Sequence, residues 1–135
     1  MPSFLVRNPT ATLPALRGDP ARARGCDLRV RHGRIAEIGT LTPEPGERQI
    51  DAGGCAIYPS WVNTHHHLFQ SLLKGDTVGL NATLTPWLGA TPQRLRPLMT
   101  ENDFRLAARI GLLELALSGC GTVADHNYHY YPGMP

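Results

Sequence analysis

Three consecutive histidines, His65 to His67, follow a run of strand-forming residues in the stretch WVNTHHHLFQ. If the strand continues through them, its side chains alternate between two faces, so His65 and His67 point one way and His66 points the other. Two imidazoles on one face of a rigid strand can converge on a metal ion, because a neutral imidazole nitrogen binds zinc or iron(II) well. An H-x-H pattern alone fits equally a polar strand end whose histidines bond to loops.

The residues before the histidines have a β pattern up to about residue 56. FLVRN and DLRVRHGRIAEIG carry branched residues in alternation, and His32-Gly33 is suited to a tight hairpin turn. These segments predict a small antiparallel sheet, and RQID predicts a further short strand. The intervening segment PTATLPALRGDPARARG has no sustained period, so we expect a surface excursion there and assign it no chemistry.

From residue 57 onward the pattern changes to strand, helix, helix and strand. LFQSLLKG has helical spacing, whereas residues 76–97 predict a long loop with one or two short helical turns at most. A helix is expected over about residues 101–118, with Thr100 as its N-cap and Gly119 just beyond its end. GTVADHNY predicts a second buried strand with a polar end. The order indicates a parallel βα unit whose strand ends carry polar side chains, as in barrel-type α/β folds.

The composition argues against several classes of partner. The formal net charge is +2 and 18% of the residues are charged, without a basic stripe of the kind that tracks phosphate, so no nucleic-acid partner is expected. Arg7, Pro9 and Pro14 interrupt the N-terminal stretch before a signal-peptide core could form, and no window approaches the ~18 apolar residues that span a bilayer. We therefore expect a cytoplasmic protein with no membrane partner.

Three motifs in order carry a family resemblance that covers essentially the whole chain. GGCAIYPSWVNTHHHLFQSLLKG resembles the stretch of the amidohydrolase superfamily that closes an N-terminal β-sandwich and opens a barrel with a strand ending in H-x-H. TLTPWL and ELALSGCGTVADHNYHYYPG are similar to the cytosine/guanine deaminase-like branch, which deaminates fused-ring amino-heterocycles. The resemblance implies an α/β fold in which residues 1–56 are the N-terminal β-sandwich segment. Residues 57–135 would be the first two βα units of a metal-dependent (β/α)8 barrel.

The resemblance also implies a metal site that this chain supplies in part. The family's first two metal ligands fall on His65 and His67, and His66 falls on the variable middle position between them. The expected cofactor is one divalent metal ion, zinc, with iron as the alternative. The family's two later histidines, its metal-binding Asp and its Glu proton shuttle would lie beyond Pro135, so we expect no catalytic residue within this chain.

Three further residues are candidates for contacts with the substrate. Gln70 matches a position that faces the substrate in related deaminases, and its amide, which both donates and accepts, suits a lactam edge. Trp87 could stack on a flat ring, although a tryptophan more commonly packs in a core. Tyr128 lies at the polar end of the second strand, and its neighbours Asp125 and His126 are weaker candidates for supporting roles.

The function implied is that of a hydrolase acting on C–N bonds other than peptide bonds. Its substrate would be isoxanthopterin, 8-oxoguanine or a related pterin or purine, its product ammonia, and its full-length form a homo-oligomer. Chlorohydrolases and amidases of the same superfamily share the H-x-H strand and are the alternative enzymes. A non-catalytic fragment or a small metal-binding module is the other alternative, because two histidine ligands leave a zinc site incomplete.

Overall fold

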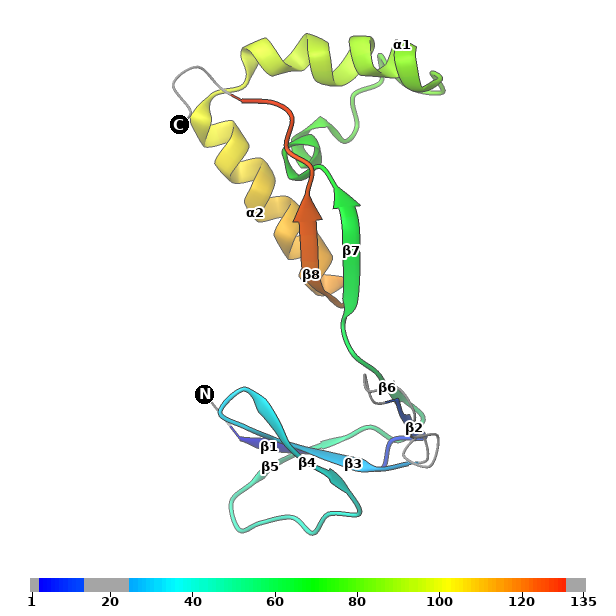
Figure 1. Ribbon diagram of the computed structural model, residues 1–135, viewed down its shortest axis with the longest axis vertical. Helices are drawn as coiled ribbons and strands as arrows, with labels where there is room; N and C mark the ends of the chain where they lie inside the picture. Colours follow the sequence, from blue (N-terminus) through cyan, green and yellow to red (C-terminus); the bar gives the residue numbers. More distant parts are fainter. Residues whose placement is uncertain (1–2, 14–24, 131–135) are drawn as a thin grey trace. The chain divides into compact units, whose positions relative to one another are not determined.

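The computed structural model describes residues 3–13 and 25–130, so residues 14–24 of the predicted surface excursion lie outside the described residues. The chain divides into two compact units, Met1–Pro59 and Ser60–Pro135. The described part of the first unit contains strands, whereas the second combines strands with helices (Figure 1). No helix in the described ranges is long and apolar enough to cross a membrane.

The first unit holds a four-stranded sheet in the order β4-β3-β1-β5 and a separate parallel pair of β2 and β6. The bounds are β1 (Phe4–Arg7), β2 (Ala11–Thr12), β3 (Asp27–Arg31), β4 (Arg34–Gly39), β5 (Arg48–Asp51) and β6 (Ala56–Ile57). The hairpin of β3 and β4 is confirmed. His32 and Gly33 adopt φ values of 52° and 74° at its turn, as a two-residue turn with both central residues left-handed requires.

The structure adds two features that the sequence did not predict. The predicted strands do pair antiparallel, β1 with β3 and β3 with β4, but the further strand β5 runs parallel to β1, so the sheet is mixed. A strand that is not joined to its neighbour by a hairpin can add in either direction, and side-chain alternation does not encode that direction. The start of the excursion also contains β2, whose two residues pair with β6. A strand of two residues is too short to show side-chain alternation in the sequence, so only its pairing with β6 identifies it.

Arg29 ties the connection between β4 and β5 to the sheet. The side chain is buried, and its guanidinium donates to Oε1 of Glu47 at 2.7 Å, to Oε1 of Glu37 at 2.9 Å and to the carbonyl of Thr42 at 2.6 Å. The hydrogen bond from Arg29 holds the pKa of the Glu47 carboxyl below its usual value. A buried charge needs such partners, and these fix the loop that leads into β5.

The second unit is built on the parallel strands β7 (Trp61–His66) and β8 (Cys120–Asp125), which confirms the predicted parallel pair. The helical elements between them are η2 (Leu68–Leu73), α1 (Leu84–Leu88), η3 (Gly89–Gln93), η4 (Arg96–Leu98) and α2 (Glu101–Leu117). The predicted caps of α2 are present. Thr100 and Asp103 form a reciprocal capping box, and Gly119 follows the helix with φ 83°.

Helix α2 packs on η2 around a small apolar core. Phe69 and Leu73 of η2 cluster with Phe104 of α2, and the two phenylalanine rings are stacked 6.1 Å apart. Gly111 permits this approach, because a Cβ there would lie 2.6 Å from Oγ of Ser71. This packing holds η2, which directly follows the histidines, against α2.

The loop prediction for residues 76–97 was wrong, because α1, η3 and η4 form a helical run over residues 84–98. Its prolines are accommodated: Pro86 lies in the first turn of α1, where no backbone N–H is needed, and Pro92 lies in the wider π-helical turn of η3. The prediction of a buried β8 was also wrong, since most of its residues are exposed. Among the described strands only β7 pairs with it, which leaves its outer edge uncovered.

Candidate metal and substrate site

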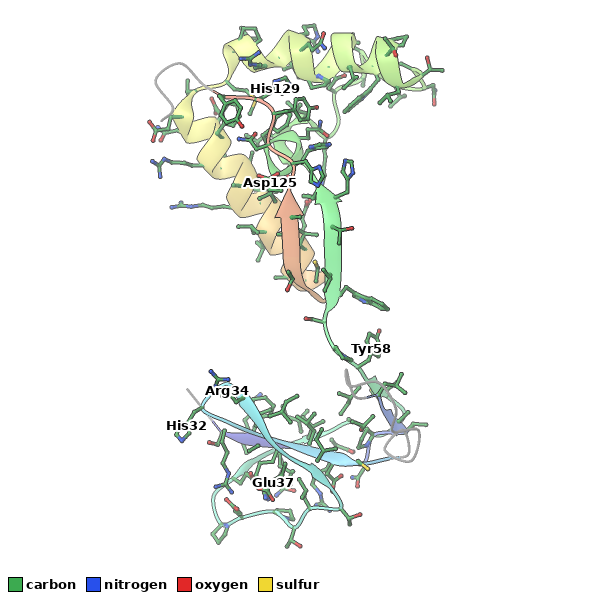
Figure 2. All side chains as sticks on the ribbon, in the orientation of Figure 1. His32, Arg34, Glu37, Tyr58, Asp125 and His129 are labelled. Atoms are coloured by element: carbon green, nitrogen blue, oxygen red, sulfur yellow. The ribbon has the colours of Figure 1, made fainter. Side chains whose placement is uncertain are left out.

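The parallel pairing of β7 and β8 brings two polar strand ends together. His66 lies opposite Asp125 in the register, and the backbone N–H of His126 donates to the carbonyl of His66 at 2.7 Å. Figure 2 labels Asp125 at the end of β8, beside the end of β7 that carries the histidines. Parallel strands end at the same edge of a sheet, so residues about sixty positions apart share this edge.

His65 and His67 turn their outer ring nitrogens toward each other. The two Nε2 atoms are 3.2 Å apart, and the ring planes are nearly perpendicular at 89°. Two nitrogen ligands of a tetrahedral zinc ion, with bonds of about 2.0–2.1 Å, lie about 3.3–3.4 Å apart. The separation therefore fits two ligands of one ion without rearrangement of the strand.

The ring of His67 is held in the orientation that a ligand needs. Its Nδ1 lies 2.7 Å from the backbone carbonyl of His126, and because a carbonyl oxygen only accepts, Nδ1 must carry the proton. The lone pair of the neutral ring is then on Nε2, which faces His65. A backbone carbonyl that fixes a histidine tautomer in this way is a common outer partner in metal sites.

His65 and His67 have no third metal-binding side chain beside them, because no group of three or more His, Cys, Asp or Glu side chains that could hold an ion occurs among the described residues. Asp125 does not join the histidines as a ligand, since its Oδ1 accepts from the backbone N–H of Leu68 at 3.0 Å and so anchors the start of η2. His126 stacks on the ring of His65, with ring centroids 4.4 Å apart. His126 thus contacts the pair directly, whereas Asp125 fixes the residue that follows it.

Gln70 and Tyr128, two of the predicted substrate contacts, bind each other beside His67. The side-chain nitrogen of Gln70 donates to the Tyr128 hydroxyl at 2.8 Å. The ring of Tyr128 meets the ring of His67 edge to face, with centroids 4.9 Å apart. The hydrogen bond uses one donor of Gln70 and leaves its carbonyl oxygen and the hydroxyl proton of Tyr128 for other partners.

A hollow of about 490 Å3 lies next to these residues, within the range of small-molecule sites. Its lining brings together four of the five predicted site residues: His65, His67, Gln70 and Trp87. Tyr128 is connected to the hollow through its hydrogen bond with Gln70. Lys74 also lines it, but its ammonium is ion-paired with Glu114 of α2.

Sequence reasoning missed His129, which lies just beyond β8 (Figure 2). The side chain is 6% exposed, and neither ring nitrogen has a hydrogen-bond partner. Its ring contacts Phe69 edge to face at 4.7 Å between centroids. Burial, followed by the charges of Arg96 and His67, lowers the pKa of His129. A histidine within a polar run gives no sign of burial, because here the burial comes from packing against η2.

His129 makes a pH-dependent contribution to stability. Because the pKa of His129 in the folded protein is below its ordinary value of 6.5, the unfolded chain binds a proton more readily. The stability that the neutral ring supports is present above pH 6.5 and should be lost as the pH falls below it. In the full-length enzyme that the sequence predicts, we expect the melting temperature to fall less between pH 7.5 and 5.5 in a His129→Phe variant than in the wild type. His32→Asn is the control, because His32 is exposed and asparagine suits its positive φ. The same fall of melting temperature between pH 7.5 and 5.5 in the wild type and both variants would contradict the prediction.

Comparison with protein families gives a match to the Amidohydrolase family over residues 56–135. Isoxanthopterin deaminase from an unknown prokaryotic organism is 64% identical over 137 residues, a match that covers 99% of this chain and 28% of that protein. The 8-oxoguanine deaminase of Pseudomonas aeruginosa is 38% identical over 135 residues, covering 96% of this chain and 28% of that protein. The chain thus spans 28% of the length of both relatives.

Solved structures share the fold of the chain. An amidohydrolase from an environmental sample of the Sargasso Sea superposes with a TM-score of 0.73 at 52% identity, covering 99% of this chain and 28% of that one. Atrazine chlorohydrolase TrzN from Arthrobacter aurescens TC1, complexed with zinc, gives a TM-score of 0.75 at 25% identity, covering 90% of this chain and 28% of that one.

Proposed function

Because the chain belongs to the amidohydrolase family, we propose that it is the N-terminal portion of a metal-dependent aminohydrolase, hereafter the parent enzyme. The proposed reaction is the hydrolytic deamination of a fused-ring amino-heterocycle, such as isoxanthopterin, 8-oxoguanine or a related pterin or purine, with release of ammonia. The observation that carries this proposal is the 64% identity to isoxanthopterin deaminase along 99% of the chain. The fold that goes with it has residues 1–56 as a β-sandwich segment and residues 57–135 as the first two βα units of a barrel.

In this proposal His65 and His67 are two ligands of one divalent metal ion, zinc or alternatively iron. Support comes from the 3.2 Å separation of their Nε2 atoms and from the carbonyl of His126, which fixes the tautomer of His67. Zinc in the related TrzN structure is consistent with the choice of ion. A bound divalent ion would supply a water of lowered pKa at this edge of the strands. The later ligands and the proton shuttle would come from the remainder of the parent enzyme.

Gln70, Trp87 and Tyr128 are the proposed substrate contacts. The free carbonyl oxygen of Gln70 can accept from a ring N–H, and the Tyr128 hydroxyl, which already accepts from Gln70, can donate to a ring acceptor. Trp87 lines the same hollow and offers an indole face for stacking on a flat bicyclic ring. These contacts orient a planar, polar heterocycle next to the histidine pair. The expected cytoplasmic location, homo-oligomeric state and lack of nucleic-acid or membrane partners stay predictions.

A chlorohydrolase of the same superfamily is the second candidate. The favouring observation is the TM-score of 0.75 with atrazine chlorohydrolase. The identity to that protein is 25%, against 64% to isoxanthopterin deaminase, so sequence favours deamination.

An ammonia-coupled assay of the parent enzyme tests the proposal. Pterins, purines, cytosine and chlorotriazines are offered as substrates, with chloride release measured in parallel for the chlorotriazines. We expect isoxanthopterin or 8-oxoguanine to be turned over with a kcat/KM of roughly 10⁴–10⁸ M⁻¹s⁻¹. Turnover restricted to a chlorotriazine would instead support the second candidate.

A further inference from the structure

The loop between η2 and α1 is locked against the helix that follows it. Asp76 at the start of the loop accepts from Nη2 of Arg94 at 2.6 Å and from the backbone N–H of Val78 at 3.3 Å. These bonds outweigh the effect of burial and hold the pKa of the Asp76 carboxyl below its usual value. The loop is thus tied at its beginning to a residue eighteen positions further along the chain.

Close packing holds the middle of the same loop. Gly79 is buried, and a Cβ at this position would lie 2.5 Å from Oγ1 of Thr91 and 2.7 Å from Cδ1 of Trp87. The absence of a side chain therefore lets the loop backbone lie directly on Trp87. Any residue carried by this loop is fixed relative to the proposed stacking surface.

Asn81 is the residue that this locked loop presents to the hollow. It adopts φ 62°, a left-handed conformation that asparagine tolerates better than most residues. Two turn hydrogen bonds flank it, from the N–H of Leu80 to Thr77 at 3.1 Å and from the N–H of Ala82 to Gly79 at 3.2 Å. The side chain is exposed and lines the hollow together with Gln70 and Trp87.

The amide of Asn81 is free, in contrast to most of the polar groups around it. Lys74 and Asp76, which line the hollow too, are ion-paired with Glu114 and Arg94. Gln70 has already donated to Tyr128. The Asn81 side chain makes no hydrogen bond to the described residues, so both its donor and its acceptor remain for a ligand.

We propose that Asn81 is a substrate-contacting residue of the parent enzyme whose side-chain amide pairs with the lactam edge of the heterocycle. A lactam presents a C=O acceptor next to an N–H donor, which is the complement of a carboxamide. The inference rests on the proposed function and adds a residue that determines specificity. A site built around such a pairing discriminates strongly against analogues that lack the matching groups.

The test replaces Asn81 in the parent enzyme without straining its backbone. Asn81→Gly removes the amide and tolerates a positive φ, while Asn81→Asp keeps the shape but loses the donor. We expect kcat/KM for the amino-lactam to fall roughly 10- to 100-fold in both variants, as the loss of one or two hydrogen bonds predicts. Metal content and melting temperature should stay at wild-type values. Asn102→Ala, an exposed position on α2, is the matched control.

A second measurement separates contact from general damage. Inhibition constants are compared for the lactam product and for an analogue in which a ring C–H group replaces the C=O group of that lactam. Asn81→Gly should raise the inhibition constant of the lactam product and change that of the analogue by no more than about twofold. Equal loss for both ligands, or wild-type kinetics in Asn81→Gly, would overturn the role of Asn81 while leaving the proposed function intact. A parent enzyme that deaminates no amino-lactam would overturn both.

Discussion

Replacement of His65 or His67 by alanine should strip the metal from the parent enzyme, whereas replacement of His66 should leave the metal content nearly unchanged. The Nε2 atoms of His65 and His67 already lie at the separation of two ligands, so either change removes one metal bond. Loss of a ligand should reduce metal affinity by more than the ~10–100-fold that an outer partner typically contributes. Deamination should fall with the metal, since the ion would supply the activated water.

Metal content per protomer, measured after dialysis against a weak chelator, checks this result. His126→Ala is an informative control, because His126 reaches His67 through its backbone carbonyl, which the alanine variant keeps. We expect that variant to retain its metal although it loses the ring stacked on His65. A larger metal loss in His66→Ala than in the other two histidine variants would refute the assignment of the ligands.

The sequence predicted those parts of the fold whose signals are local. The turn at His32-Gly33 and the capping box of Thr100 and Asp103 depend on residues at most three positions apart, and both are present in the structure. The parallel pair β7 and β8 was predictable because a helix of sufficient length separates the two strands. The direction of β5 could not be predicted in this way, because it depends on a partner more than forty residues away.

The helical run over residues 84–98 was not predicted, because several residues that usually interrupt helices occur within it. Residues 84–98 contain Pro86, Gly89, Pro92 and Pro97, which on average interrupt helices. Their positions decide the outcome: Pro86 is in a first turn, and the π-helical turn around Pro92 places that residue in the interior. Tertiary packing therefore overrides local propensity here, and the result is a helical run that carries Trp87 to the hollow.

In the candidate site, too, local sequence patterns predicted some features, whereas others depend on tertiary packing. Alternation along a strand was enough to predict that His65 and His67 share a face, and their ring nitrogens do meet. The hydrogen bond between Gln70 and Tyr128 joins residues 58 positions apart, so no local pattern encodes it. The burial of His129 and the exposure of Asn81 likewise depend on how η2 and the following loop pack.

Residues 1–135 expressed alone should show no deamination above background and only weak zinc binding. Two imidazoles with no third His, Cys, Asp or Glu ligand among the described residues cannot hold a catalytic zinc ion, which needs three protein ligands. The second unit also exposes large apolar side chains that a stable domain would cover, at fractions of 58% for Trp61, 63% for Val62 and 80% for Leu117. We therefore expect a poorly soluble or molten polypeptide.

Three measurements on the purified chain check this expectation: ammonia release, calorimetric titration with zinc, and thermal unfolding followed by near-ultraviolet circular dichroism. The parent enzyme in the same buffers is the control, because it shares every residue of the chain and differs in the ligands and packing that the remainder would add. A variant of the isolated chain lacking both His65 and His67 should bind zinc more weakly than the unaltered isolated chain, because it has lost the proposed ligand pair. If the isolated chain instead stayed monomeric, unfolded cooperatively and released ammonia from any amino-heterocycle, its own residues would suffice for catalysis. The two-ligand account of the site would then be wrong, since an activated water held in place requires more than the His65 and His67 pair provides.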